Sequence, residues 1–308
     1  MTSSVSSYDR VETEVEGRRL SLSHLDKVLF PEVGFTKGQL IDYYVRIAPV
    51  MLPHLRDRPV TFRRFPDGVE GQGFFEKHVP SHAPEWVRSV TVPSSGADGG
   101  SVEYPVVGDV ATLVWAANLG TIEFHVPLWH VGRRRRLPAP PDHLVFDLDP
   151  GEGADIVDCC RVAVWIAGDP DDPAAPVEGV YPKSSGSKGL QLYLPLRGRP
   201  TWEKVKEQAH ATAARLEAEH PEAVVSSMRK AERQGRVLID WSQNTPSKTT
   251  VAAYSVRARA EPTVSTPVTW EEVAACAEGG DPSRLRFTTD EVLERVADDG
   301  DRFAPLGT

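Results

Sequence analysis

The segment from His143 to Gly151 carries the strongest chemical signal in the chain, because two aspartates two positions apart close an apolar run. Successive side chains of a strand point to opposite faces, so Asp147 and Asp149 project to the same side. Neighbouring carboxylates repel each other unless a cation lies between them, and oxygen ligands suit hard divalent ions such as Mg²⁺ or Mn²⁺. The alternative for this motif alone is a strand that ends in an Asp-Pro-Gly turn.

A second apolar run, residues 237–239, also ends in an acid, Asp240. This aspartate is a candidate third carboxylate of the same site. In two-metal phosphoryl transfer, ions about 3.5–4 Å apart hold the attacking and leaving oxygens and need carboxylates on a rigid element. The alternative is an aspartate that only terminates a strand.

Residues 184–194, SSGSKGLQLYL, could bind a phosphate group. Small residues let backbone amides approach an anion, hydroxyls can donate to it, and Lys188 adds a positive charge. The motif is not a Walker loop, because a strand and not a helix is expected to follow it. A plain Gly/Ser turn is the alternative.

Alternating helix and strand signals must position these residues. Capping residues and apolar periodicity predict helices from Thr36 to near Pro53, over 109–118, 155–167 and 202–220, and after Thr269 and Thr288. Strands are predicted over 58–64, 87–92, 121–126, 143–149, 190–194, 237–239 and 249–256. The uneven spacing predicts an α+β fold with mixed or antiparallel sheets flanked by helices. We expect one compact unit over 21–300, an N-terminal extension over 1–20 and a C-terminal tail over 301–308.

The composition of the chain limits which partners it can bind and in which cellular compartment it can function. The net charge of −9 argues against a nucleic-acid partner at first sight. Residues 261–308 hold eleven acids and four bases, however, so the rest of the chain is nearly neutral and contains an arginine run, Arg133–Arg136. No apolar stretch approaches the ~20 residues of a membrane span, and the three cysteines form no disulfide or zinc pattern. These features predict a cytoplasmic protein.

Seven motifs in order resemble the polymerase domain of bacterial ATP-dependent DNA ligase D, of the archaeo-eukaryotic primase superfamily. They are LDKVLFP (25–31), RPVTFRRFPDGV (58–69), FFEKHVP (74–80), EFHVPLW (123–129), HLVFDLDPGEG (143–153), SSGSKGLQLY (184–193) and DWSQNTPSKTTVAAYSVRAR (240–259). The resemblance covers about residues 20–300. It implies a primase-polymerase core, and because no ligase or nuclease motif is present we expect a stand-alone chain or an excised domain.

The resemblance implies a template-directed nucleotidyltransferase that fills short gaps at DNA double-strand breaks in non-homologous end joining, with two Mn²⁺ or Mg²⁺ ions and a preference for ribonucleotides. Implied partners are gapped or 3′-overhang DNA with a 5′-phosphate, nucleoside triphosphates, a Ku-type end-binding protein and a separate ligase. In the bacterial cytoplasm such a protein would associate with the nucleoid. The alternatives are a non-catalytic module for DNA-end binding and synapsis, and a metal-dependent nuclease or phosphohydrolase.

The resemblance also assigns site residues. The catalytic, metal-binding set is Asp147, Asp149 and Asp240; the nucleotide set is His125, Ser185, Lys188, Gln191, Gln243 and Arg257; the 5′-phosphate set is Lys27, Lys37 and His24; the template and DNA set is Arg63, Arg64, Phe74, Phe75 and Lys77. Of the two adjacent phenylalanines, we expect only one to stand exposed. The family usually has histidine at position 191, so glutamine predicts weaker nucleotide affinity unless Lys188 and Arg257 compensate.

Overall fold

The computed structural model describes residues 10–93, 100–131, 137–168 and 179–307. The arginine run 133–136 lies outside these ranges.

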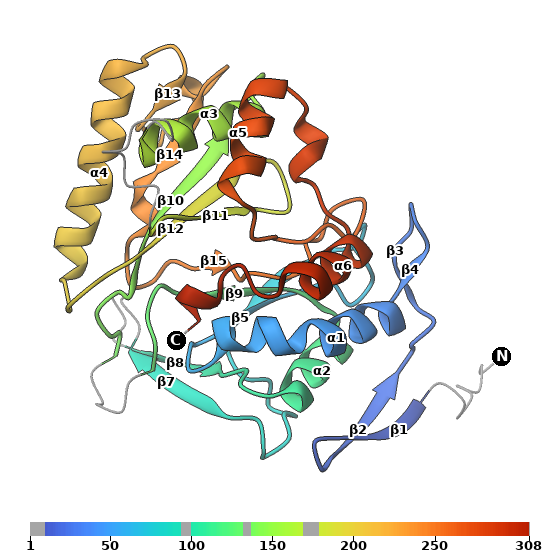
Figure 1. The fold of residues 1–308 in the computed structure, drawn as a ribbon. Helices are drawn as coiled ribbons and strands as arrows, with labels where there is room; N and C mark the ends of the chain where they lie inside the picture. The colour runs from blue at the N-terminus through green and yellow to red at the C-terminus, as the bar shows by residue number, and fades with distance from the viewer. Residues whose placement is uncertain (1–9, 94–99, 132–136, 169–178, 308) are drawn as a thin grey trace.

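Two sheets form the centre of the molecule (Figure 1). The first has the strand order β11 (Tyr181–Ser184), β12 (Leu190–Pro195), β10 (His143–Pro150), β14 (Val237–Asp240) and β13 (Val224–Val225). The second has the order β15 (Thr250–Val251), β9 (Thr121–Val126), β5 (Thr61–Arg64) and β6 (Phe74–Glu76). Neighbouring strands are antiparallel except β13 and β14, which are parallel. The predicted α+β fold with mixed sheets is confirmed.

Helices cover both sheets, and most begin where the sequence predicts. They are α1 (Lys37–Leu55), α2 (Val110–Asn118), α3 (Ile156–Ala167), α4 (Trp202–Glu219), α5 (Trp270–Gly279) and α6 (Thr289–Asp299). Reciprocal capping boxes at Thr36, Thr269 and Thr288 start three of them, as predicted. Three short antiparallel pairs complete the fold: β1 (Arg10–Val15) with β2 (Arg18–Ser23), β3 (Val28–Phe30) with β4 (Phe35–Thr36), and β7 (Ser89–Pro93) with β8 (Ser101–Pro105).

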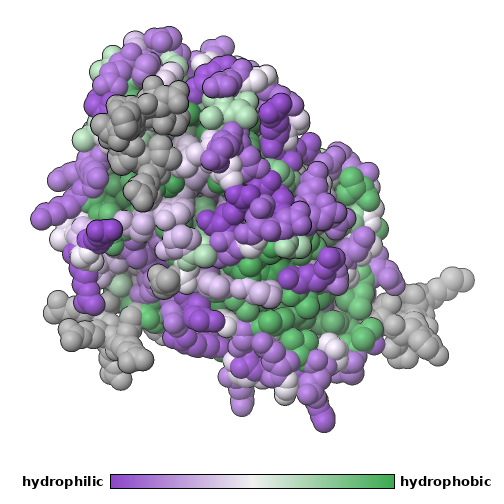
Figure 2. Space-filling model, in the orientation of Figure 1, coloured by the Kyte–Doolittle hydropathy of each residue, from purple (hydrophilic) through white to green (hydrophobic). Residues whose placement is uncertain are grey.

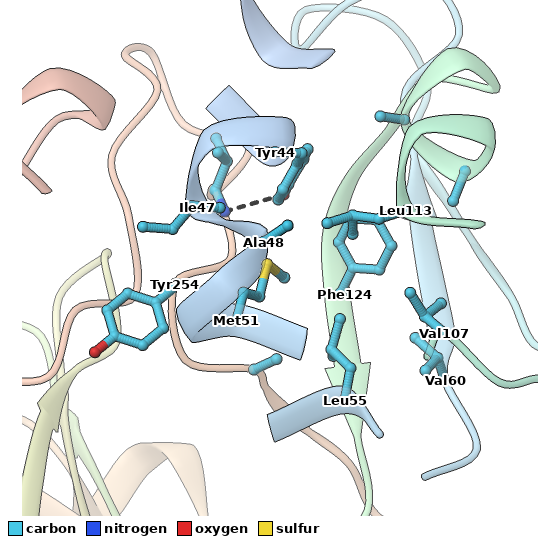
Figure 3. Close-up of a cluster of buried hydrophobic side chains, with 14 of the residues drawn as sticks. Tyr44, Ile47, Ala48, Met51, Leu55, Val60, Val107, Leu113, Phe124 and Tyr254 are labelled. Carbon is cyan, nitrogen blue, oxygen red and sulfur yellow. Dashed lines mark hydrogen bonds between the residues drawn. The ribbon is translucent and has the colours of Figure 1, made fainter. Parts of the chain in front are cut away.

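The hydrophobic core has two parts, one behind each sheet. Figure 3 shows the first, where α1 packs on α2 and β9, and Tyr44 meets Phe124 edge to face with ring centres 5.0 Å apart. The second lies between the first sheet and α3, α4 and α5. Hydrophilic residues cover most of the face drawn in Figure 2, with apolar residues gathered over the region of α1. No helix in the described ranges has both the length and the apolar character needed to span a bilayer.

Two predictions about the strands need correction. The strand expected over 249–256 contains only β15, because the chain turns at Tyr254, whose φ is +67°. The β1–β2 hairpin was not predicted; its turn uses Glu16 and Gly17, both at positive φ. The Glu16 carboxylate accepts hydrogen bonds from the first amides of α2, so the hairpin is tied to the body.

The boundaries of the compact unit predicted over 21–300 stay a prediction. Residues near both ends pack on the body, however. Leu20 and Leu22 at one end and Phe303 and Leu306 at the other belong to the first core.

Candidate active site

Three carboxylates lie on one face of the first sheet because the strand register places them there. Leu144, Phe146 and Leu148 alternate toward the second core, so the odd-numbered positions of β10 face the other way. Asp147 pairs directly with Asp240 of β14 and, on its other side, with Gln191 of β12. Directly opposite side chains have Cβ atoms about 4.5–5.5 Å apart. The structure therefore brings the two predicted acidic strands together.

The acids are crowded: Asp147 and Asp240 are buried, whereas Asp149, near the end of its strand, is exposed. Burial and the neighbouring charge of Asp149 raise the pKa of Asp147 well above its usual range, although a hydrogen bond from Gln191 opposes the shift. Burial and the charge of Asp240 likewise raise the pKa of Asp149. These carboxylates resist being ionised at the same time, because together they bring an excess of negative charge into the site.

Neutral and basic side chains hold these acids. Gln243 Nε2 lies 3.2 Å from Asp147 Oδ2 and 3.4 Å from Asp240 Oδ2, so one amide bridges both carboxylates. Lys248 Nζ lies 3.4 Å from Asp240 Oδ2. Sequence reasoning did not single out Lys248, although it lies inside the last of the seven motifs.

The donor set suits a hard divalent cation. In the described part of the chain, no three His, Cys, Asp or Glu side chains are arranged as a group that could hold a metal ion. The three aspartates nevertheless share one face, and their mutual repulsion is what a divalent cation would relieve. Asp147, Asp149 and Asp240 are thus the residues that could hold it.

The Ser/Gly loop between β11 and β12 is built around Ser185. Its Oγ accepts hydrogen bonds from the amides of Ser187 and Gly189 at 3.2 and 3.1 Å, so this hydroxyl organises the loop. A Cβ at Gly189 would lie 2.2 Å from the Leu148 carbonyl oxygen, so only glycine fits beside β10. Lys188 stands exposed at the tip of the loop.

Glu123 of β9 joins three of the predicted basic residues. Its buried carboxylate accepts from Arg63 Nη1 at 2.9 Å and from His125 Nε2 at 2.8 Å, and it lies 3.3 Å from Arg257 Nε. Burial raises the pKa of Glu123, but the His125 hydrogen bond and the Arg257 charge outweigh this effect and lower it. Sequence reasoning missed Glu123; the signal was an acid inside the apolar strand TIEFHV.

A cavity of about 440 Å³ lies between the two sheets and is lined by many of these groups, although Asp240 is not among its lining residues. Of the predicted residues, it is lined by His125, Asp147, Asp149, Ser185, Lys188, Gln191, Gln243 and Arg257. Arg233 and Arg259 also line it and were not predicted. Carboxylates on one wall and basic groups on the other can bind a metal-complexed polyphosphate.

The aromatic pair lies on the edge strand β6. Phe74 is 42% exposed and Phe75 is 58% exposed, so the expectation that only one would stand exposed is wrong. Among the described elements β6 pairs only with β5, so it forms an edge of the second sheet. Arg64 lies over Phe74 and Arg63 over Phe75, each with its guanidinium carbon 5.4 Å from the ring centre.

Phe75 also connects the aromatic edge to the cavity, because its ring centre lies 5.4 Å from that of His125. Lys77, next along the chain, is exposed and lines a separate cavity of about 350 Å³. Of the predicted template residues, Phe75 thus contacts the predicted nucleotide residue His125, and Arg63 shares the Glu123 carboxylate with it.

His24, Lys27 and Lys37 meet at the other side of the molecule, near β3 and β4, well away from β10 and β14 (Figure 1). The Lys27 amide donates to the His24 carbonyl at 3.1 Å, and the Lys37 amide to the Lys27 carbonyl at 2.8 Å. Lys37 Nζ donates to the Ser23 carbonyl at 2.5 Å. Burial, together with the charge of Lys27, lowers the pKa of Lys37 to about 8.

The chain is similar to known proteins of one family. A family model described as the LigD primase-polymerase domain matches residues 36–303. The multifunctional non-homologous end joining protein LigD of Mycolicibacterium smegmatis is 40% identical over 288 residues, 94% of this chain and 36% of that protein. The bifunctional LigD of Bacillus subtilis is 31% identical over 286 residues, 92% of this chain and 44% of that protein. The chain therefore spans less than half the length of these curated relatives.

A solved structure is similar over nearly its whole length. The polymerase domain from Mycobacterium tuberculosis ligase D, in complex with DNA, matches with a TM-score of 0.84 and 41% identity. The match covers 94% of this chain and 98% of that one.

Proposed function

This chain belongs to the LigD primase-polymerase domain family, and we propose that it is a DNA-directed nucleotidyltransferase that fills short gaps at double-strand breaks in non-homologous end joining. One observation carries the proposal: a single cavity is lined by Asp147, Asp149, the Ser/Gly loop and Arg257, and Asp240 pairs with Asp147 on the neighbouring strand. The related polymerase domain was solved with DNA, which supports DNA as the partner of this chain.

The reaction we propose is in-line attack of a primer 3′-oxygen on the α-phosphate of a nucleoside triphosphate, with pyrophosphate as the leaving group. Lys188 and Arg257 would bind the triphosphate and neutralise the charge that builds on pyrophosphate. His125, Ser185 and Gln243 would hold the nucleotide in place.

Asp147, Asp149 and Asp240 would hold two divalent ions, Mn²⁺ or Mg²⁺. Such ions, when bound, stabilise the attacking and leaving oxygens as Lewis acids. The carboxylates themselves fix where the primer end meets the α-phosphate. The ribonucleotide preference of the proposal rests on the resemblance of the sequence motifs.

DNA would be held at two places outside the cavity. Phe74 and Phe75 offer exposed rings on which template bases can stack, and Arg63, Arg64 and Lys77 lie beside them to contact DNA. His24, Lys27 and Lys37 would bind the 5′-phosphate on the far side of the gap. We further propose that the chain acts at the bacterial nucleoid with a Ku-type end-binding protein and a separate ligase.

Primer extension on a gapped duplex with a downstream 5′-phosphate tests the function. Ribonucleotides and deoxyribonucleotides are compared in Mn²⁺ and in Mg²⁺, and Asp147→Ala should abolish extension while DNA binding persists. Asp42→Asn, at an exposed position of α1, is the matched control and should leave extension unchanged. Release of nucleotides without a triphosphate would favour a nuclease, and binding without synthesis would favour an end-binding module.

A further inference from the structure

Lys183 of β11 is a buried lysine on the same face of the sheet as the acids, only 1% exposed. Its ammonium donates to Gln191 Oε1 at 2.7 Å, to Ser265 Oγ at 2.5 Å and to the Val251 carbonyl at 3.2 Å, which uses all three of its protons. Among the described residues no carboxylate forms an ion pair with it. Burying a lysine without a carboxylate partner costs folding free energy, so we looked for a role of Lys183 in the site.

Gln191 connects Lys183 to the site. The strand register places Lys183, Gln191, Asp147 and Asp240 in one row across β11, β12, β10 and β14. Gln191 Nε2 donates to Asp147 Oδ1 at 3.0 Å. A lysine only donates and a carboxylate only accepts, so a single orientation of the Gln191 amide satisfies both neighbours. The amide is therefore locked from both sides.

We propose that Lys183 is a positioning residue for Asp147 and acts through the Gln191 amide. Without the ammonium, Gln191 Oε1 would be a buried acceptor with no donor, so the side chain would turn toward another donor and release Asp147 Oδ1. Residues that orient metal-binding carboxylates change metal affinity by about 10- to 100-fold when they are removed. Gln191 therefore links Asp147 to Lys183, whereas the histidine usual in the family would make a cationic contact itself.

The inference depends on the proposed function in one respect: Asp147 must bind a divalent ion. The test is Mn²⁺ affinity of the full chain, measured by isothermal titration calorimetry without DNA or nucleotide. Lys183→Met fills a similar volume and removes the donor. We expect Mn²⁺ to bind about tenfold more weakly. Gln191→Met breaks the same connection at the amide and should give the same loss.

The double variant Lys183→Met/Gln191→Met separates positioning from a structural role. If Lys183 acts only through Gln191, the double variant binds Mn²⁺ as weakly as Gln191→Met alone; additive losses would overturn the proposal. Ser265→Ala is the matched control: it removes a different acceptor of Lys183, so it should change Mn²⁺ affinity less than twofold. Lys183→Leu replaces Lys183→Met if circular dichroism shows that the latter does not fold.

The outcomes distinguish this inference from the proposed function. Wild-type Mn²⁺ affinity in the Lys183 variant, or no Mn²⁺ binding by the wild-type chain, refutes the positioning role. If the variants lose affinity as expected but the wild-type chain extends no primer, the positioning role stands and the polymerase assignment fails.

Discussion

Replacing Asp147 by asparagine should make the protein more stable when no divalent ion is present. Asp147 is buried opposite Asp240 and two positions from Asp149, so its charge is repelled from two sides. Asparagine has nearly the same shape and removes that charge. Its amide oxygen can still accept from Gln191, and its NH2 group can donate to Gln243 Oε1, which is buried without a partner, once the Gln243 amide turns over.

The expected gain follows from the strand geometry. Two unit charges about 6 Å apart repel by about 3 kcal/mol at an effective dielectric constant of about 20, and Asp147 has two such neighbours. Part of this repulsion is already avoided by protonation. Removing the charge also weakens the hydrogen bond from Gln191 and reverses the one with Gln243, at a cost of about 1 kcal/mol each. The net gain in unfolding free energy is about 2 kcal/mol, or about 3 °C in melting temperature for a chain of this length.

The assay is urea unfolding in EDTA at about pH 8 and about pH 5. Burial and Asp149 raise the pKa of Asp147 above its usual 3.8, so between 3.8 and the raised value the native protein binds more protons than the unfolded chain. Stability of the wild type therefore falls as pH rises through this window. The advantage of the variant should be largest at the higher pH, and Asp42→Asn should show none at either.

Two results would refute this reasoning. One is a variant that is less stable than the wild type at pH 8 in EDTA. The other is an equal gain at both pH values, because charge repulsion requires the carboxylate to be ionised. Saturating Mn²⁺ should reverse the order, because it stabilises the protein that binds it more tightly.

Three further predictions concern other parts of the site. Glu123→Gln leaves partly buried basic neighbours uncompensated and should lower the unfolding free energy by about 3 kcal/mol in urea titrations, whereas an unchanged midpoint would show that Glu123 is not their anchor. Since the pKa of Lys37 is lowered to about 8, its ammonium is lost as pH rises through that value. The preference for a downstream 5′-phosphate, measured as a ratio of dissociation constants, should fall between about pH 7 and 9, and a flat ratio would contradict a role for Lys37. Gly189→Ala forces its Cβ against the Leu148 carbonyl and should lower the melting temperature by several degrees in calorimetry. Gly108→Ala, where the new Cβ meets no neighbour and φ is not positive, is the comparison and should lose less.

The sequence alone determined the features that depend on local spacing. Capping boxes link residues three apart, so the starts of α1, α5 and α6 were predictable. Alternation along β10 placed Asp147 and Asp149 on one face for the same reason. The seven ordered motifs indicated the family, which the comparisons confirmed.

Tertiary structure decided which distant residues meet. Whether Asp240 joins Asp147 depends on β14 pairing beside β10, a contact between segments far apart in the chain. The roles of Glu123 and Lys183 arise from burial among partners on other strands, and no local pattern encodes burial of that kind. The two exposed phenylalanines show the same limit, because exposure depends on which elements cover β6 and not on its own sequence.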